Sequence, residues 1–260
     1  MTDPHGPGES EGGDLPPGLL EDYLRSARAQ LDFLGSLASR IADHPDDPDL
    51  LGEFRRESHK MRGSAGSYGF PAATRVAGEI EDAAKAWIAD ATLNREARGR
   101  TAVDQVARLR AAFGAALDRV SGHTPPAPAG GTDQETAAQV YLVEDDPSLI
   151  ELFEYGLRSR DYRFEVFTNG REALDKLRRV PLAGSHPLLI LDVDLPALDG
   201  YAIFDALRYE RPGAFRVVFI TVHGSEDEQV RALQSGAVDY LVKPVNLRVA
   251  LEKIGRWIGR

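Results

Sequence analysis

The sequence contains no cysteine, so disulfide bonds and thiolate metal sites are excluded. No apolar run approaches the roughly 18 residues that a membrane-spanning helix needs, and the polar, acidic N-terminus is unlike a signal peptide. The formal net charge of −10 leaves little of the basic surface that nucleic acids and anionic membranes attract. These absences favour a cytoplasmic protein without membrane insertion and without direct binding to nucleic acid.

Two stretches of biased composition divide the 260 residues into two domains. Residues 1–16 are rich in glycine, proline and acidic residues, and we expect a disordered N-terminal tail. Residues 121–137 are rich in proline and glycine, which is typical of a linker. The predicted domains therefore span residues 17–120 and 138–260.

The first domain carries four stretches in which apolar residues recur at steps of three and four, which predicts four amphipathic helices. Gly69 is expected to end the second helix, and Pro71 to begin the third. With short connections, the four helices predict an up-and-down bundle. The four apolar stripes are Leu20, Leu24, Ala27, Leu31, Leu34, Ala38 and Ile41; Leu51, Phe54, Ser58, Met61, Ala65 and Tyr68; Ala73, Val76, Ile80, Ala84 and Trp87; and Val103, Val106, Leu109, Phe113, Leu117 and Val120.

A histidine on the second helix has unusual neighbours. Because a helix advances about 100° per residue, His59 points away from the apolar stripe and is expected to face solvent. Gly63 and Gly66 lie on its face, although each helical glycine costs about 1 kcal/mol relative to alanine. Their absence of side chains would let another protein bring a reactive group to the imidazole, and Arg55 and Arg62 would offset the charge of a phosphoryl group. A surface histidine beside a fraying helix is the alternative interpretation.

The stretch His59-Lys-Met-Arg-Gly-Ser-Ala-Gly-Ser-Tyr-Gly69 resembles the signature of histidine-containing phosphotransfer (HPt) domains. The resemblance is specific around His59 and architectural over the rest of residues 17–120. It implies a four-helix bundle in which His59 on the second helix is the phospho-acceptor, with Arg62, Gly63 and Gly66 forming the surroundings of the phosphohistidine.

The second domain alternates short apolar runs with helical patterns, which is typical of βαβ units and a parallel sheet. Ser225-Glu-Asp-Glu228 resembles a capping box that opens the fourth helix of this domain. The five predicted strands lie near residues 140–144, 163–168, 187–192, 216–221 and 239–242.

Four of these strands deliver polar residues to the edge of the sheet where parallel α/β folds place their chemistry. Asp192 follows the third strand and could accept a phosphoryl group as a nucleophile. Glu144 and Asp145 follow the first strand and could hold Mg²⁺ together with Asp192, because Mg²⁺ prefers hard oxygen ligands. Whether Asp146 replaces one of this pair is a question of register. The strand ends also deliver Thr221, which could hydrogen-bond a phosphoryl oxygen, and Lys243, which could hold another.

This set is similar to the receiver domain of two-component response regulators, over residues 138–260. The resemblance implies a flavodoxin-like (βα)5 fold, a phospho-acceptor Asp192, a metal site at Glu144, Asp145 and Asp192, and a cis peptide before Pro244. It also implies that Thr221 and Tyr240 move inward together on phosphorylation. Asp194 departs from the family, since many receivers carry methionine or asparagine at this position, where access of the hydrolytic water is tuned.

The sequence therefore predicts a phosphorelay protein that transfers phosphoryl groups through His59 and Asp192. No stretch offers the glycine-rich boxes of an ATP-binding kinase, so we expect a phosphotransfer protein rather than an enzyme that uses ATP. Its partners would be an upstream histidine kinase or phospho-receiver and a downstream receiver or HPt protein, and the receiver could dimerise on phosphorylation.

Three alternatives remain open. Asp192-Val-Asp194 also resembles the nucleophile motif of haloacid-dehalogenase-type phosphatases, although that family places it on the first strand. The chain could instead be an interaction module that works without phosphate. It could also be the N-terminal regulatory part of a longer response regulator whose output domain is absent from this sequence.

Overall fold

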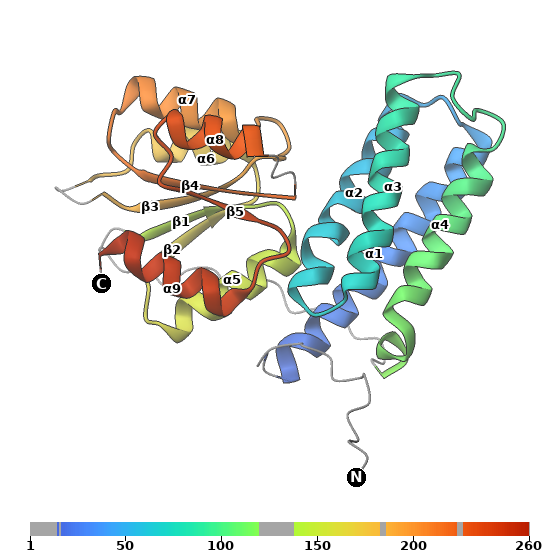
Figure 1. The fold of residues 1–260 in the computed structure, drawn as a ribbon, viewed down its shortest axis with the longest axis horizontal. Helices are drawn as coiled ribbons and strands as arrows, with labels where there is room; N and C mark the ends of the chain where they lie inside the picture. The colour runs from blue at the N-terminus through green and yellow to red at the C-terminus, as the bar shows by residue number, and fades with distance from the viewer. Residues whose placement is uncertain (1–14, 16, 120–137, 183–185, 223–225, 260) are drawn as a thin grey trace, which may run out of the picture.

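The computed structural model describes residue 15 and residues 17–119, 138–182, 186–222 and 226–259. The predicted linker, nearly all of the predicted N-terminal tail, Val120 and Ser225 of the predicted capping box lie outside these residues. The described residues form a helical bundle and an α/β domain that lie side by side (Figure 1). Within the described ranges, no helix is both long and apolar enough to cross a membrane.

Four long helices form the first domain, as the periodicity predicts. Asp47 begins the second helix by accepting hydrogen bonds from the backbone N–H groups of Asp49 and Leu50. Gly69 follows that helix with a φ of +89°, which favours glycine, and Pro71 begins the next helix. The elements are α1 (Pro17–Asp43), α2 (Pro48–Ser67), α3 (Pro71–Ala89) and α4 (Arg98–Phe113), with a 3-10 turn at Gly114–Arg119.

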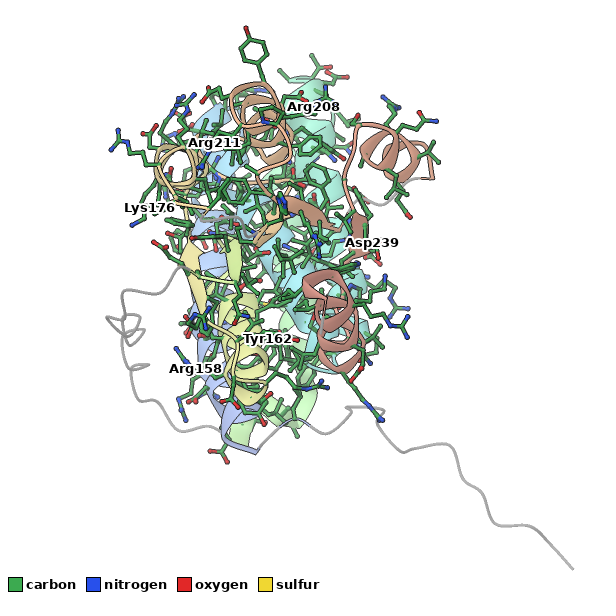
Figure 2. All side chains as sticks on the ribbon, turned by 90° about the vertical axis from the view of Figure 1, so that its left-hand side faces the viewer. Arg158, Tyr162, Lys176, Arg208, Arg211 and Asp239 are labelled. Carbon is green, nitrogen blue, oxygen red and sulfur yellow. The ribbon has the colours of Figure 1, made fainter. Side chains whose placement is uncertain are left out.

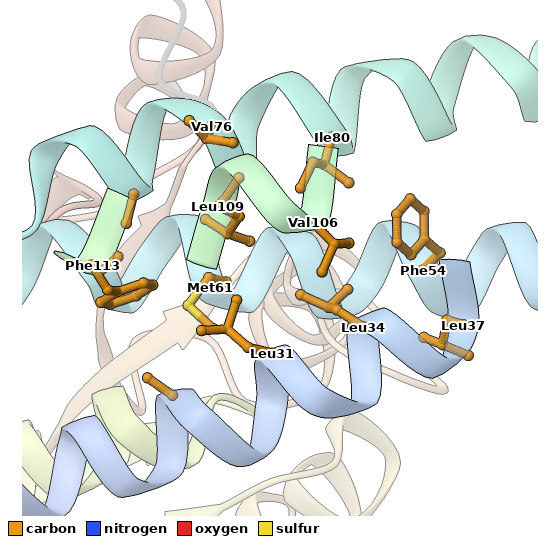
Figure 3. Close-up of a cluster of buried hydrophobic side chains, with 14 of the residues drawn as sticks. Leu31, Leu34, Leu37, Phe54, Met61, Val76, Ile80, Val106, Leu109 and Phe113 are labelled. Atoms are coloured by element: carbon orange, nitrogen blue, oxygen red, sulfur yellow. The ribbon is translucent and has the colours of Figure 1, made fainter. Parts of the chain in front are cut away.

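The apolar stripes of the four helices meet in one core, part of which is drawn in Figure 3. Two described stripe residues depart from the prediction: Leu20 is only partly buried, and Val103 is 44% exposed. The reason for the exposure of Val103 lies at Gly99, where an added Cβ would lie 2.3 Å from Cα of Ala42. Because α4 approaches α1 this closely, the small Ala102 faces the core and Val103 turns outward.

The second domain is a five-stranded parallel sheet of order β2-β1-β3-β4-β5, so the predicted flavodoxin-like fold is confirmed. Apolar side chains alternate between the two faces of the sheet; α5 and α9 cover one face, and α6, α7 and α8 the other (Figure 1). The strands are β1 (Val140–Val143), β2 (Phe164–Phe167), β3 (Leu188–Asp192), β4 (Arg216–Thr221) and β5 (Asp239–Val242). The helices are α5 (Pro147–Ser159), α6 (Gly170–Leu177), α7 (Gly200–Glu210), α8 (Glu226–Gln234) and α9 (Leu247–Ile258).

The bundle docks at the carboxyl edge of the sheet, chiefly through α2. The hydroxyl of Tyr68 donates a hydrogen bond to the carbonyl oxygen of Ser148 at 2.9 Å. The backbone N–H of Val245 donates to Oγ of Ser67 at 2.8 Å. Figure 2 views the α/β domain from the side away from the bundle, where Lys176 and Arg208 are labelled. The chemistry-bearing edge predicted from the strand ends therefore faces the bundle.

Candidate functional site between the two domains

Three carboxylates meet at the carboxyl ends of β1 and β3. Ligand atoms from Glu144, Asp145 and Asp192 all lie within 4.8 Å of one another. Asp146 has a different task, because its Oδ1 accepts a hydrogen bond from the backbone N–H of Ser148 at 2.9 Å and so caps α5. The cluster contains the first two acids of the run, Glu144 and Asp145, and not the third. Three carboxylates provide the hard oxygen donors that fit a divalent cation such as Mg²⁺.

Lys243 bridges two of these carboxylates. Its Nζ lies 2.8 Å from Oε2 of Glu144 and 3.0 Å from Oδ2 of Asp192, and all three side chains are buried. Burial and the neighbouring Asp192 raise the pKa of Glu144 well above its ordinary value. Burial alone would lower the pKa of Lys243, but Asp192 and Glu144 raise it instead. The ammonium group is therefore held in its charged form beside Asp192.

The other predicted residues of the receiver site lie on the neighbouring strands β4 and β5. Thr221 ends β4 and is fully buried. Tyr240 on β5 is also buried, with its hydroxyl oxygen 3.5 Å from that of Tyr201. The peptide bond between Lys243 and Pro244 is cis, as the family resemblance implied.

The prediction that His59 faces solvent is wrong, because the second domain covers this residue. The side chain points away from the apolar stripe of its own bundle, yet the residue is only 5% exposed. Its Nε2 lies 3.6 Å from Oδ2 of Asp194. An added Cβ at Gly63 would lie 3.0 Å from Cδ of Lys243, and one at Gly66 would lie 2.4 Å from Cβ of Pro244. The two glycines thus permit a close approach, and the approaching group belongs to the same chain.

Glu81 on α3 is a site residue that the sequence analysis missed. Its side chain is fully buried, with Oε1 3.0 Å from Nδ1 of His59 and Oε2 3.1 Å from Nη1 of Arg62. Arg62 therefore reaches the histidine through Glu81. The signal was present, since Glu81 lies one turn before Ala84 and directly follows Ile80 in the apolar stripe of its helix, where a carboxylate needs a partner.

A cavity of about 220 Å³ opens between the domains beside His59. Basic residues of α2 line one wall, and acidic residues of the α/β domain line the other. Across it, Nζ of Lys60 lies 3.1 Å from Oδ2 of Asp145. The charged lining residues are Arg55, Arg56, Lys60, Asp145, Asp194 and Asp199.

Two known families match separate parts of the chain. Residues 18–121 match the Hpt domain family. Residues 140–255 match the response regulator receiver domain family. The chain joins an HPt domain to a receiver domain. Proteins built from these domains act in two-component phosphorelays, and neither domain is a kinase domain.

Curated response regulators match a little under half of this chain. The transcriptional regulatory protein PcoR of Escherichia coli is 34% identical over 125 residues, which cover 47% of this chain and 52% of PcoR. The response regulator protein FleR of Pseudomonas aeruginosa is 35% identical over 120 residues, covering 46% of this chain and 24% of FleR. The chain thus spans about half of PcoR and a quarter of FleR.

A solved structure also matches part of this chain. The receiver domain of a putative LuxO repressor protein from Vibrio parahaemolyticus is 29% identical, with a TM-score of 0.43. The match covers 47% of this chain and 91% of that structure.

Proposed function

We propose that the chain is a phosphorelay protein in which Asp192 and His59 each accept a phosphoryl group and hand it on. One observation carries the proposal. Nε2 of His59 lies 3.6 Å from Asp194, two residues from Asp192, and Lys243 lies 3.0 Å from Asp192. The two candidate acceptors therefore lie in one buried polar site.

Residues of the receiver supply a nucleophile and neutralise charge. Asp192 would attack phosphorus through a carboxylate oxygen and form an acyl phosphate. Mg²⁺, held by Glu144, Asp145 and Asp192, would offset the charge of the incoming group. Lys243 would hold one phosphoryl oxygen, and Thr221 would hydrogen-bond another and couple the phosphorylated state to Tyr240.

Transfer to the HPt domain then exchanges one bond for another. The lone pair on Nε2 of His59 attacks phosphorus, the phosphorus–oxygen bond to Asp192 breaks, and its electron pair returns to the carboxylate. Glu81 accepts a hydrogen bond from Nδ1–H, and this fixes the imidazole tautomer whose Nε2 carries the lone pair. The reverse sequence of bonds loads Asp192 from phosphorylated His59.

The proposal also defines the partners. An upstream histidine kinase or phospho-receiver supplies the phosphoryl group, and a downstream receiver or HPt protein removes it, in the cytoplasm. The chain acts as a phosphoacceptor and carrier and does not phosphorylate itself from ATP. PcoR is named a transcriptional regulatory protein, and we infer that this chain would influence such an output through a partner rather than by contacting nucleic acid.

The test loads the purified chain with a radiolabelled small acyl phosphate and Mg²⁺ and then maps the label by its chemical stability. We expect hydroxylamine-labile label on Asp192 and alkali-stable label on His59. Asp192→Ala should lose both, and His59→Gln should lose only the alkali-stable label. Label that is unchanged in Asp192→Ala would contradict the proposal.

Glu81→Gln is expected to slow phosphoryl transfer to His59 by about tenfold or more. A tenfold decrease in rate corresponds to a loss of about 1.4 kcal/mol of transition-state stabilisation. An amide can present its N–H₂ group to Nδ1 and so favour the wrong tautomer of His59. The measurement is the rate at which alkali-stable label appears. Glu79→Gln is the matched control, because Glu79 pairs with Arg108 on the surface of the bundle. Equal rates in the two variants would remove Glu81 from the mechanism.

Asp194→Asn is expected to accelerate transfer between Asp192 and His59 by about tenfold. A phosphoryl group bound to Nε2 would meet the Asp194 carboxylate, and two charges about 4 Å apart repel by about 4 kcal/mol at an effective dielectric of 20. Because the Asp194 side chain is 27% exposed, screening leaves only part of this repulsion. Asp205→Asn on the exposed side of α7 is the control, and a rate no higher than that of the control would contradict the argument.

A further inference from the structure

The surface of the bundle around His59 is already occupied. We define the docking face as Gly63 and Gly66 of α2 together with Tyr68, which directly follows the helix. Atoms of Lys243 and Pro244 approach the two glycines, and the tyrosine hydroxyl bonds to the backbone of α5. Any external protein that exchanges a phosphoryl group with His59 needs the same face.

Helix α5 of the receiver has buried apolar side chains on two of its sides. Ile150 and Phe153 pack with the strands of the receiver sheet. Leu149 and Leu152 are fully buried in the core cluster of the HPt bundle instead. A receiver helix that faced water on its outer side would expose both leucines, so the contact removes apolar surface from water on each side.

Charge complementarity adds to this apolar contact. Lys60 of the bundle pairs with Asp145 of the receiver, with Nζ and Oδ2 3.1 Å apart. The basic side of the interdomain cavity, formed by Arg55 and Arg56, lies opposite the acidic residues Asp194 and Asp199. The docking face thus fits an acidic receiver edge in both shape and charge.

We propose that the receiver is the intramolecular partner of the HPt domain, and that the docked chain is a closed form which exchanges the phosphoryl group internally and excludes external partners. The inference rests on the proposed function and adds its regulation. In the closed form His59 and Asp192 are both buried. An upstream donor or downstream acceptor must therefore compete with the chain's own domain, and the link to other proteins opens only when the domains separate.

Tethering makes the internal reaction distinguishable from exchange between molecules. For two domains joined by a short linker, the effective concentration of one domain at the other is about 1 mM. At about 10 μM protein, transfer within a chain is therefore expected to be about 100-fold faster than transfer between chains, and its rate constant should not depend on protein concentration.

The experiment uses two full-length chains that can react only with each other. The donor is His59→Gln, which holds label on Asp192, and the acceptor is Asp192→Ala, which can receive it only on His59. In each chain a second substitution is designed to separate the two domains. It lies in the domain that takes no part in transfer between the chains, which is the HPt domain of the donor and the receiver of the acceptor. The donor also carries Gly66→Ala, whose Cβ would meet Pro244 at 2.4 Å, and the acceptor also carries Leu149→Glu.

The control chains carry, instead of these two substitutions, a substitution to the same residue type at an exposed or uncrowded position of the same helix. Gly52→Ala lies on α2, where an added Cβ meets only Arg56 at 3.5 Å among the described residues. Tyr155→Glu lies on α5 at a side chain that is 41% exposed. Circular dichroism and thermal melting serve to check that each variant folds, which matters for Gly66→Ala because its Cβ would also lie 2.8 Å from Oγ1 of Thr74.

We expect the opened pair to transfer label about tenfold faster than the control pair, and label in the unmodified chain to reach His59 at a rate independent of protein concentration. Control chains that exchange as fast as opened chains, or an unmodified-chain rate proportional to concentration, would overturn the closed form. Absence of label on His59 in every sample, including the opened pair, would instead overturn the proposed function and this inference with it.

Discussion

Lys243→Met is expected to slow the loading of Asp192 from a small phosphodonor by about 100-fold. The ammonium group lies within 3.0 Å of both Glu144 and Asp192 in a fully buried setting. Removing a preorganised charge that faces the developing negative charge typically costs a factor of about 100 to 1,000 in rate. The variant also leaves two buried carboxylates without their shared cation, so we expect a lower melting temperature that Mg²⁺ partly restores.

The measurement for Lys243→Met is the initial rate of hydroxylamine-labile labelling. Lys253→Met is the matched control, because Lys253 also pairs with an aspartate, Asp239 at 3.1 Å, but with a side chain that is 38% exposed. If both variants are phosphorylated on Asp192 at the rate of the unmodified chain, the role assigned to Lys243, holding a phosphoryl oxygen, is wrong.

His59→Gln is expected to remove alkali-stable label completely while the loading of Asp192 changes by no more than about twofold. Glutamine can still hydrogen-bond Glu81, so the buried carboxylate keeps a partner, but it offers no nucleophilic nitrogen lone pair. The domains should therefore remain docked although the second acceptor is lost.

His44→Gln provides the comparison for this result. His44 is an exposed histidine in the turn between α1 and α2, so its replacement should leave both kinds of label unchanged. Alkali-stable label that survives in His59→Gln but disappears in His44→Gln would contradict the assignment.

Most of the fold could be predicted because it follows from local periodicity. The stripe that runs from Leu51 on α2 to Tyr68, just after that helix, is buried as predicted, and the apolar run ending at Asp192 is a central strand. Val103 shows where periodicity stops being sufficient. The side of α4 that faces the core there depends on the close packing of Gly99 against Ala42, which is a contact between distant segments.

The site was predictable within each domain but not between them. The strand ends placed Asp192 and Lys243 at one edge, because parallel strands end together. The burial of His59 could not be derived, since it depends on how two domains joined by a linker dock. Leu149 and Leu152 carried part of that information, because they give α5 a second apolar side that the receiver sheet does not use.

The most direct test of the account is a pulse–chase measurement on the unmodified chain. The receiver is loaded with labelled phosphodonor and Mg²⁺, the donor is removed, and hydroxylamine-labile and alkali-stable label are followed in the same sample. The account predicts that alkali-stable label rises as labile label falls, and that Asp192→Ala never acquires it. Labile label that decays only to inorganic phosphate, with none appearing on His59, would contradict the transfer between Asp192 and His59.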